Sequence, residues 1–111
     1  MHVDLIAEIK HAYQTRKLAP VRGYFYLHDD LACPLMALAI HRGIVDRNDP
    51  GIAGADACTV VEWSAQRFGE QWTRGFLDGF DSLPERTSDE SYLTAYKFGE
   101  RVAQEIVAVD A

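Results

Sequence analysis

The feature that most constrains this fold is a short run, residues 35–40, that is apolar on nearly every side. Pro34 in its first turn is typical of a helix start, and the following sequence His41-Arg42-Gly43 is typical of a helix end. A helix over residues 34–42 that has no polar face has to be surrounded by other elements. We therefore predict that this helix lies at the centre of the fold.

Apolar residues recur at three- and four-residue steps in three further segments, which is the spacing of an amphipathic helix. The first helix is predicted over residues 4–18 and ends before Pro20, because proline cannot continue a helix. The last helix is capped by Ser88 or Asp89 and ends near Val109. Between them lies a stripe of six residues: Val61, Ala65, Phe68, Trp72, Phe76 and Phe80.

This middle stripe leaves two arrangements open. Asp56 is placed to cap its start, and the phase of the stripe survives Gly69. One helix through Gly69 fits the spacing. Two helices that bend there fit it equally well, because glycine inside an exposed helix costs about 1 kcal/mol against alanine.

Turn-forming residues separate these segments at 44–55 and 81–89. The stretch 21–27 carries the cluster Tyr24-Phe25-Tyr26 and is typical of a short strand or an extended crossing segment, although a single strand would have nothing to pair with. We predict one all-α domain over residues 1–111. It is a bundle of four to five helices with a central apolar helix and room for a short extended segment at 21–27.

Two segments, 63–72 and 93–102, both contain the sequence Phe-Gly-Glu at the same position within the segment. They indicate either two pseudo-equivalent helices that cross at Gly69 and Gly99, or two amphipathic helices that converged on similar residues. The spacing of Gly75 and Gly79 adds a narrow helix face. We expect a neighbouring helix to pack closely on that face, and a bound ligand is the alternative.

Charge argues against a surface built to hold phosphate backbones. The chain carries 17 Asp and Glu against 11 Lys and Arg, a net charge of −6. Residues 1–28 hold four Lys and Arg against two Asp and Glu, a net of +2, so the remainder carries −8. The densest acid lies over residues 78–90, and no phosphate-binding glycine loop is present. Nucleic acid is therefore not an expected partner.

The longest apolar stretch falls far short of the roughly 20 residues that span a bilayer. The first turn also lacks the cationic start of a secretory signal. Two cysteines, Cys33 and Cys58, could form at most one bridge, and a chain with this many aromatic residues builds a core without it. We predict two reduced thiols that act as small buried hydrophobes, in a cytoplasmic protein without a membrane partner.

The densest group of metal-ligating and acid–base residues is His28, Asp29, Asp30 and Cys33. A metal needs three or four converging ligands, and no His-x3-His spacing is present. His28 and His41 would stand over ~10 Å apart, at a rise of about 1.5 Å per helical residue. We predict no metal and no cofactor, and expect Asp29 or Asp30 to cap the helix and His41 to occupy its last turn. The helix start favours a reactive Cys33, whereas the two carboxylates oppose it.

The residues that stand out are aromatic and glycine packing residues and an acidic surface, which are typical of a non-catalytic interaction or accessory module. We expect a homodimer. The residues expected at an interface are Tyr24, Tyr26, Trp63, Trp72, Asp78 and Asp81. A second hypothesis is a small-molecule or metal-dependent enzyme that uses the group around His28. A third is an acidic inhibitor or immunity-type protein that binds a basic partner.

Overall fold

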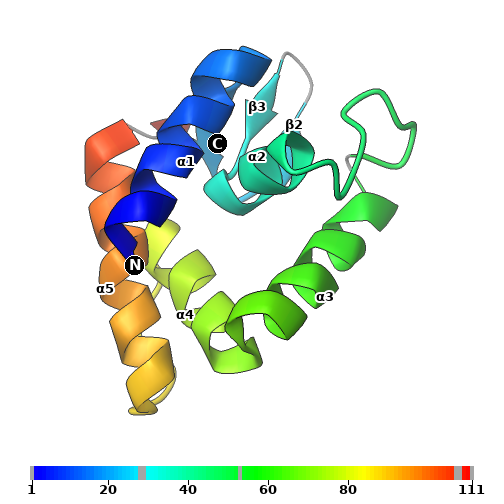
Figure 1. The fold of residues 1–111 in the computed structure, drawn as a ribbon. Coiled ribbons are helices and arrows are strands. Elements are labelled where there is room, and N and C mark those ends of the chain that lie inside the picture. Colours follow the sequence, from blue (N-terminus) through cyan, green and yellow to red (C-terminus); the bar gives the residue numbers. More distant parts are fainter. Residues whose placement is uncertain (1, 28–29, 53, 107–108, 111) are drawn as a thin grey trace. The chain divides into compact units, whose positions relative to one another are not determined.

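A computed structural model describes residues 2–27, 30–52, 54–106 and 109–110 and is mostly helical (Figure 1). Its helices are α1 (His2–Arg16), α2 (Pro34–His41), α3 (Ala55–Phe68), α4 (Glu70–Phe80) and α5 (Glu90–Ile106). Its strands are β1 (Ala19–Arg22), β2 (Tyr26–Leu27), β3 (Leu31–Ala32) and β4 (Val109–Asp110). The prediction of a helical protein is confirmed, whereas the prediction of a strictly all-α fold is wrong. None of the described helices is long and apolar enough to cross a membrane.

The chain forms two compact units. One holds residues 1–60 together with residues 108–111, and the other holds residues 61–107. The boundary falls inside α3. The single domain over residues 1–111 stays a prediction.

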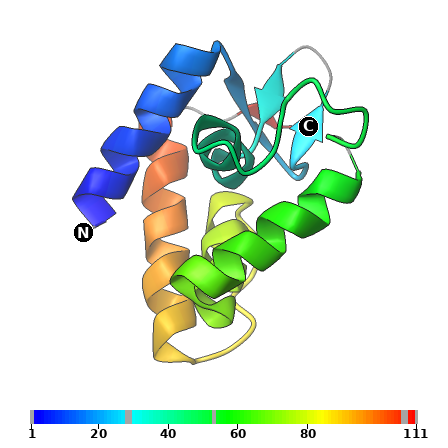
Figure 2. The ribbon, with the colours of Figure 1, turned by 45° about the vertical axis from the view of Figure 1, so that its right-hand side comes forward.

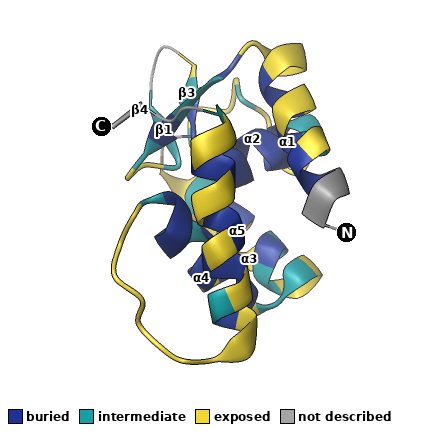
Figure 3. Cartoon of the chain, turned by 90° about the vertical axis from the view of Figure 1, so that its left-hand side faces the viewer, coloured by how far each residue is buried: buried dark blue, intermediate teal, exposed yellow. Residues whose placement is uncertain are grey.

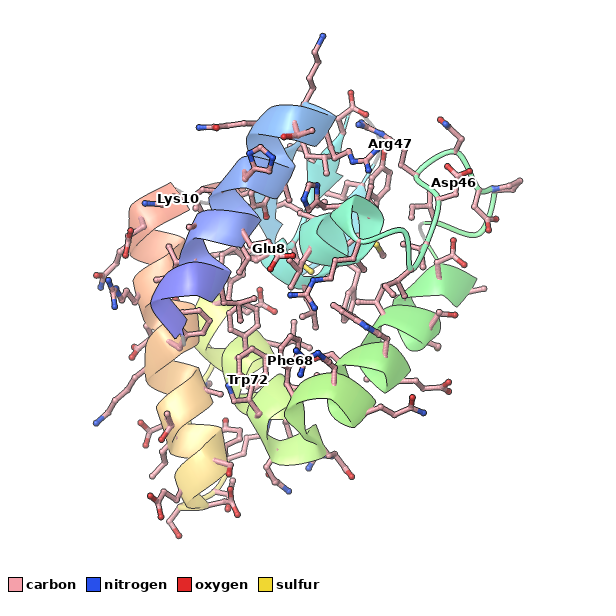
Figure 4. All side chains as sticks on the ribbon, viewed as in Figure 1. Glu8, Lys10, Asp46, Arg47, Phe68 and Trp72 are labelled. Atoms are coloured by element: carbon pink, nitrogen blue, oxygen red, sulfur yellow. The ribbon has the colours of Figure 1, made fainter. Side chains whose placement is uncertain are left out.

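In the first unit, α1 packs against α2. Ile9 and Ala12 on α1 are buried, and α2 is buried over all of its residues 34–40. An ion pair joins the two helices, because the Arg42 guanidinium donates to both carboxylate oxygens of Glu8, at 2.7 and 2.8 Å (Glu8 is labelled in Figure 4). The predicted burial of the apolar helix on all sides is confirmed.

The strands of the first unit form a small sheet in the order β2-β3-β1-β4. β1 pairs in parallel with β3 and with β4, and β2 pairs antiparallel with β3. The partners of β1 escaped prediction because each is two residues long, too short to show the alternation that marks a strand. β4 also corrects the end of the last helix, since α5 ends at Ile106 and Val109 lies in the sheet.

The start of α2 differs from the prediction in the residue that caps it. Cys33 is the N-cap, and its sulfur accepts a hydrogen bond from the N–H of Met36 at 3.4 Å. Asp30 lies before β3 instead, in a left-handed conformation with φ 66°. Asp29 lies outside the described residues. The Cys33 thiol therefore caps α2, in place of the predicted carboxylate of Asp29 or Asp30.

In the second unit, two helices rather than one carry the middle aromatic pattern. α3 ends at Phe68, and α4 follows Gly69, whose φ of 108° is a conformation that other residues rarely adopt. The buried hydroxyl groups of Ser64 and Thr73 lie 2.6 Å apart across this break. Because the helix is interrupted at Gly69, the stripe does not run along one helix. Val61, the first residue of the stripe, is exposed on α3.

α4 and α5 lie side by side and run in the same direction (Figures 1 and 2). Gly75 faces the carbonyl group of Tyr92, and one turn later Gly79 faces that of Tyr96. A Cβ on either glycine would come closer than 3.0 Å to the carbonyl group, and Gly99 on α5 meets the α4 backbone in the same way. The predicted close packing of a helix on the glycine face is confirmed.

The Phe-Gly-Glu repeat does not mark two equivalent helix crossings. Gly99 lies inside α5 at its contact with α4, whereas Gly69 separates α3 from α4. The interpretation as two pseudo-equivalent helices is therefore wrong, and the two segments share residues without sharing structure.

We expect Gly79→Ala to destabilise the second unit, although alanine is the better helix former by about 1 kcal/mol. The added methyl group falls on the Tyr96 carbonyl group, and overpacking of a tight interior costs about 1–3 kcal/mol. Urea unfolding followed by tryptophan fluorescence measures this loss, because both tryptophans, Trp63 and Trp72, belong to the second unit.

Gln104→Ala is the control, since it truncates an exposed side chain on α5 of the same unit. Its unfolding midpoint should equal that of the wild type. A Gly79→Ala midpoint at or above the wild-type value would contradict the close packing of α4 on α5.

Candidate functional site

Of the group around His28, Asp30 and Cys33 lie in the part of the chain that the structure describes. The Asp30 carboxylate is exposed and accepts a hydrogen bond from the Arg47 guanidinium. Cys33 is buried and caps α2, and His28 and Asp29 lie outside the described residues. Among the residues that the structure describes, no three His, Cys, Asp or Glu side chains are grouped to hold a metal ion.

Three other predicted residues also have defined places. His41 occupies the last turn of α2 as predicted and lies edge-to-face against His11, with ring centroids 5.3 Å apart. Asp56 lies in the first turn of α3 rather than before it. Cys33 and Cys58 both carry thiols rather than a disulfide, but Cys58 is exposed, so its prediction as a buried hydrophobe is wrong.

The predicted interface aromatics differ in exposure. Tyr24 is 52% exposed, while Tyr26 and Trp63 are half-buried. Trp72 is buried and stacks on Phe76, with ring centroids 5.1 Å apart and planes within 6° (Trp72 is labelled in Figure 4). Trp72 therefore packs in the interior of the second unit, and Tyr24 is the exposed member of the set.

Asp78, expected on an acidic surface, is a buried carboxylate at 2% exposure. The Arg86 guanidinium donates to both of its oxygens, at 2.9 and 2.7 Å, and the Tyr92 hydroxyl donates to Oδ2 at 2.7 Å. Burial and the hydrogen bond to Asp78 raise the pKa of Tyr92 above its ordinary value. The sequence signal for this burial is the position of Asp78 three residues after Gly75, on the close-packed side of α4.

The chain reverses its direction at the end of α4. Asp81 is the C-cap, and Ser82 takes a left-handed conformation with φ 59°. The N–H of Leu83 then returns to the carbonyl oxygen of Asp78 at 2.9 Å, the bond that defines a Schellman motif. Because α5 runs parallel to α4, the chain has to travel back along the helix pair before α5 begins at Glu90.

The returning chain and the first residues of α5 make up the acidic segment, residues 82–91, which is exposed throughout (Figure 3). Hydrogen bonds hold this segment at three points. The Tyr96 hydroxyl donates to the Leu83 carbonyl group, and the Arg86 guanidinium binds Asp78. The Asp89 carboxylate accepts the N–H of Tyr92 at 3.0 Å and caps α5, as one of the two predicted capping residues.

The surface of the acidic segment is negative. Glu85, Asp89 and Glu90 are exposed carboxylates, and the single cation of the segment, Arg86, is paired with Asp78 of α4. Leu83 lies among these groups at 43% exposure. The acidic segment therefore combines three carboxylates with the exposed apolar side chains of Leu83 and Pro84.

Comparisons with protein-family models, with curated proteins and with solved structures found no match. The acidic segment is therefore defined as a candidate site by its geometry and charge.

We expect Arg86→Gln to lower the free energy of unfolding more than the loss of an exposed ion pair does, because it leaves the buried Asp78 carboxylate without its cation. This loss of unfolding free energy should be smaller than the loss on breaking a fully buried ion pair, since the Arg86 side chain is 61% exposed. Urea unfolding followed by tryptophan fluorescence measures the effect.

Arg74→Gln provides the comparison, because it removes the same charge from an exposed pair with Glu70 in the same unit. Such pairs contribute about 0.5 kcal/mol or less. Equal losses in the two variants would show that Asp78 does not depend on Arg86.

Proposed function

We propose that this chain is a non-catalytic interaction module that presents its acidic segment to a basic surface of a partner protein. The observation that supports the proposal most is the conformation of that segment. Ten consecutive exposed residues are held on the helices at Leu83, Arg86 and Asp89. A surface that is ordered before binding loses less conformational entropy when a partner docks.

The chemistry of the segment describes the partner. Its carboxylates complement lysine or arginine side chains, and complementary charge increases both association rate and specificity. Leu83 supplies an apolar contact between them. A partner surface with cations around a small apolar depression fits both features, in agreement with the hypothesis of an acidic protein that binds a basic one.

Self-association is a second proposal, favoured by the exposure of Tyr24. Tyr24 precedes β2, an outer strand of the sheet, and outer strands leave backbone groups unpaired. A second copy of the chain that pairs along β2 would cover the Tyr24 side chain and the unpaired backbone groups of β2. Sedimentation should then detect a dimer, and a strict monomer at high concentration would contradict this proposal. The cytoplasmic location is also a proposal, supported by two cysteines that are not joined in a disulfide.

Binding of a short labelled peptide of lysines around a central leucine tests the acidic segment. We expect the double substitution of Glu85→Gln with Glu90→Gln to weaken binding roughly tenfold, since each exposed charge pair contributes up to ~1 kcal/mol. The affinity of the wild type should fall steeply with added salt. Fluorescence anisotropy of the labelled peptide provides the measurement.

The control combines Glu62→Gln with Glu100→Gln, which removes the same charge from exposed positions on α3 and α5 of the same unit. This variant should bind as the wild type does. Equal weakening in both double variants would mean that the peptide senses only net charge, and absence of binding by the wild type would equally reject the proposal.

A further inference from the structure

The first unit contains a pocket of about 610 Å³ that the proposed interaction function does not use. Its walls come from the end of α1, the end of α2 and the turn over residues 43–48. Ile40, Ile44 and Val45 form its apolar part, and Ile44 is 37% exposed. The volume falls within the range of small-molecule sites, which is roughly 300–1,000 Å³.

Two guanidinium groups belong to the same walls. Arg47, labelled in Figure 4, donates to the backbone carbonyl group of Arg16 and to the Asp30 carboxylate, so its position and charge are both accounted for. Arg47 therefore fixes the wall beside Arg16.

Arg16 has more binding capacity left. Its guanidinium donates to the His41 carbonyl group at 3.4 Å, a long hydrogen bond, and it forms no ion pair with the described residues. A guanidinium has five N–H donors in a fork that fits a carboxylate. Most of these donors on Arg16 remain for a ligand.

The charge that favours an anion in this pocket is that of Arg16. Asp46 is the one carboxylate among the lining residues, and its Oδ1 accepts the backbone N–H of Asn48 at 2.9 Å within its own turn. Because Arg47 is already paired with Asp30, Arg16 is the lining cation that no ion pair with the described residues neutralises. Arg16 also lies in the part of the sequence, residues 1–28, that is basic in an otherwise acidic chain.

We propose that this pocket binds a small aliphatic carboxylate. The carboxylate group pairs with the Arg16 guanidinium, and the hydrocarbon chain lies on Ile40, Ile44 and Val45.

Titration of the ¹⁵N-labelled chain of residues 1–111 with hexanoate tests the site by NMR. The amide signals of Gly43 and Ile44 should shift and saturate. Hexanamide has the same chain without the charge, and it should not produce saturable shifts at the same concentrations. Equal titrations with both compounds, or no saturation with hexanoate, would overturn the proposal.

Substitution tests whether Arg16 is the cation that pairs with the carboxylate. We expect Arg16→Gln to weaken hexanoate binding at least tenfold, while Lys17→Gln, which removes the same charge from an adjacent exposed residue outside the lining, keeps wild-type affinity. Equal affinities of the two variants would overturn the assignment. If Arg16→Gln fails to fold, Ile44→Ser tests the site instead. Weaker hexanoate binding by Ile44→Ser supports the site, and unchanged hexanoate binding rejects it.

Discussion

The close contact between α4 and α5 is the interaction on which the second unit depends. Gly75 and Gly79 on one helix and Gly99 on the other bring backbone against backbone, where any side chain would collide with a carbonyl group. The two helices also run in the same direction, so the chain that joins them cannot be a short turn. It returns along the outside of the pair, and this return creates the acidic segment (Figures 2 and 3).

A buried carboxylate fixes that returning chain. Charge in the interior needs a partner, and Asp78 obtains its partners from Arg86 in the segment and from Tyr92 on α5. The pairing neutralises the one cation of the segment, while Glu85 and Glu90 form no ion pair with the described residues and are exposed. The same ion pair therefore stabilises the unit and sets the charge of the surface that we propose meets a partner.

Regular local patterns could be predicted from the sequence, and long-range pairings could not. The apolar run after Pro34 and the glycine face of α4 each reflect a spacing along one helix, and both predictions are confirmed. The strands that pair with β1 are two residues long and distant in sequence, so no pattern revealed them. Asp78 was predicted on the surface rather than in the interior for a related reason, since its hydrogen-bond partners lie 8 and 14 residues further along the chain.

The parallel contact of α4 and α5 is tested most directly by nuclear Overhauser effects between their α protons. We predict contacts from Gly75 to Tyr92 and from Gly79 to Tyr96, in the same order along both helices. Contacts in the reverse order, or no contact between the glycine α protons and α5, would contradict the arrangement from which the acidic segment follows.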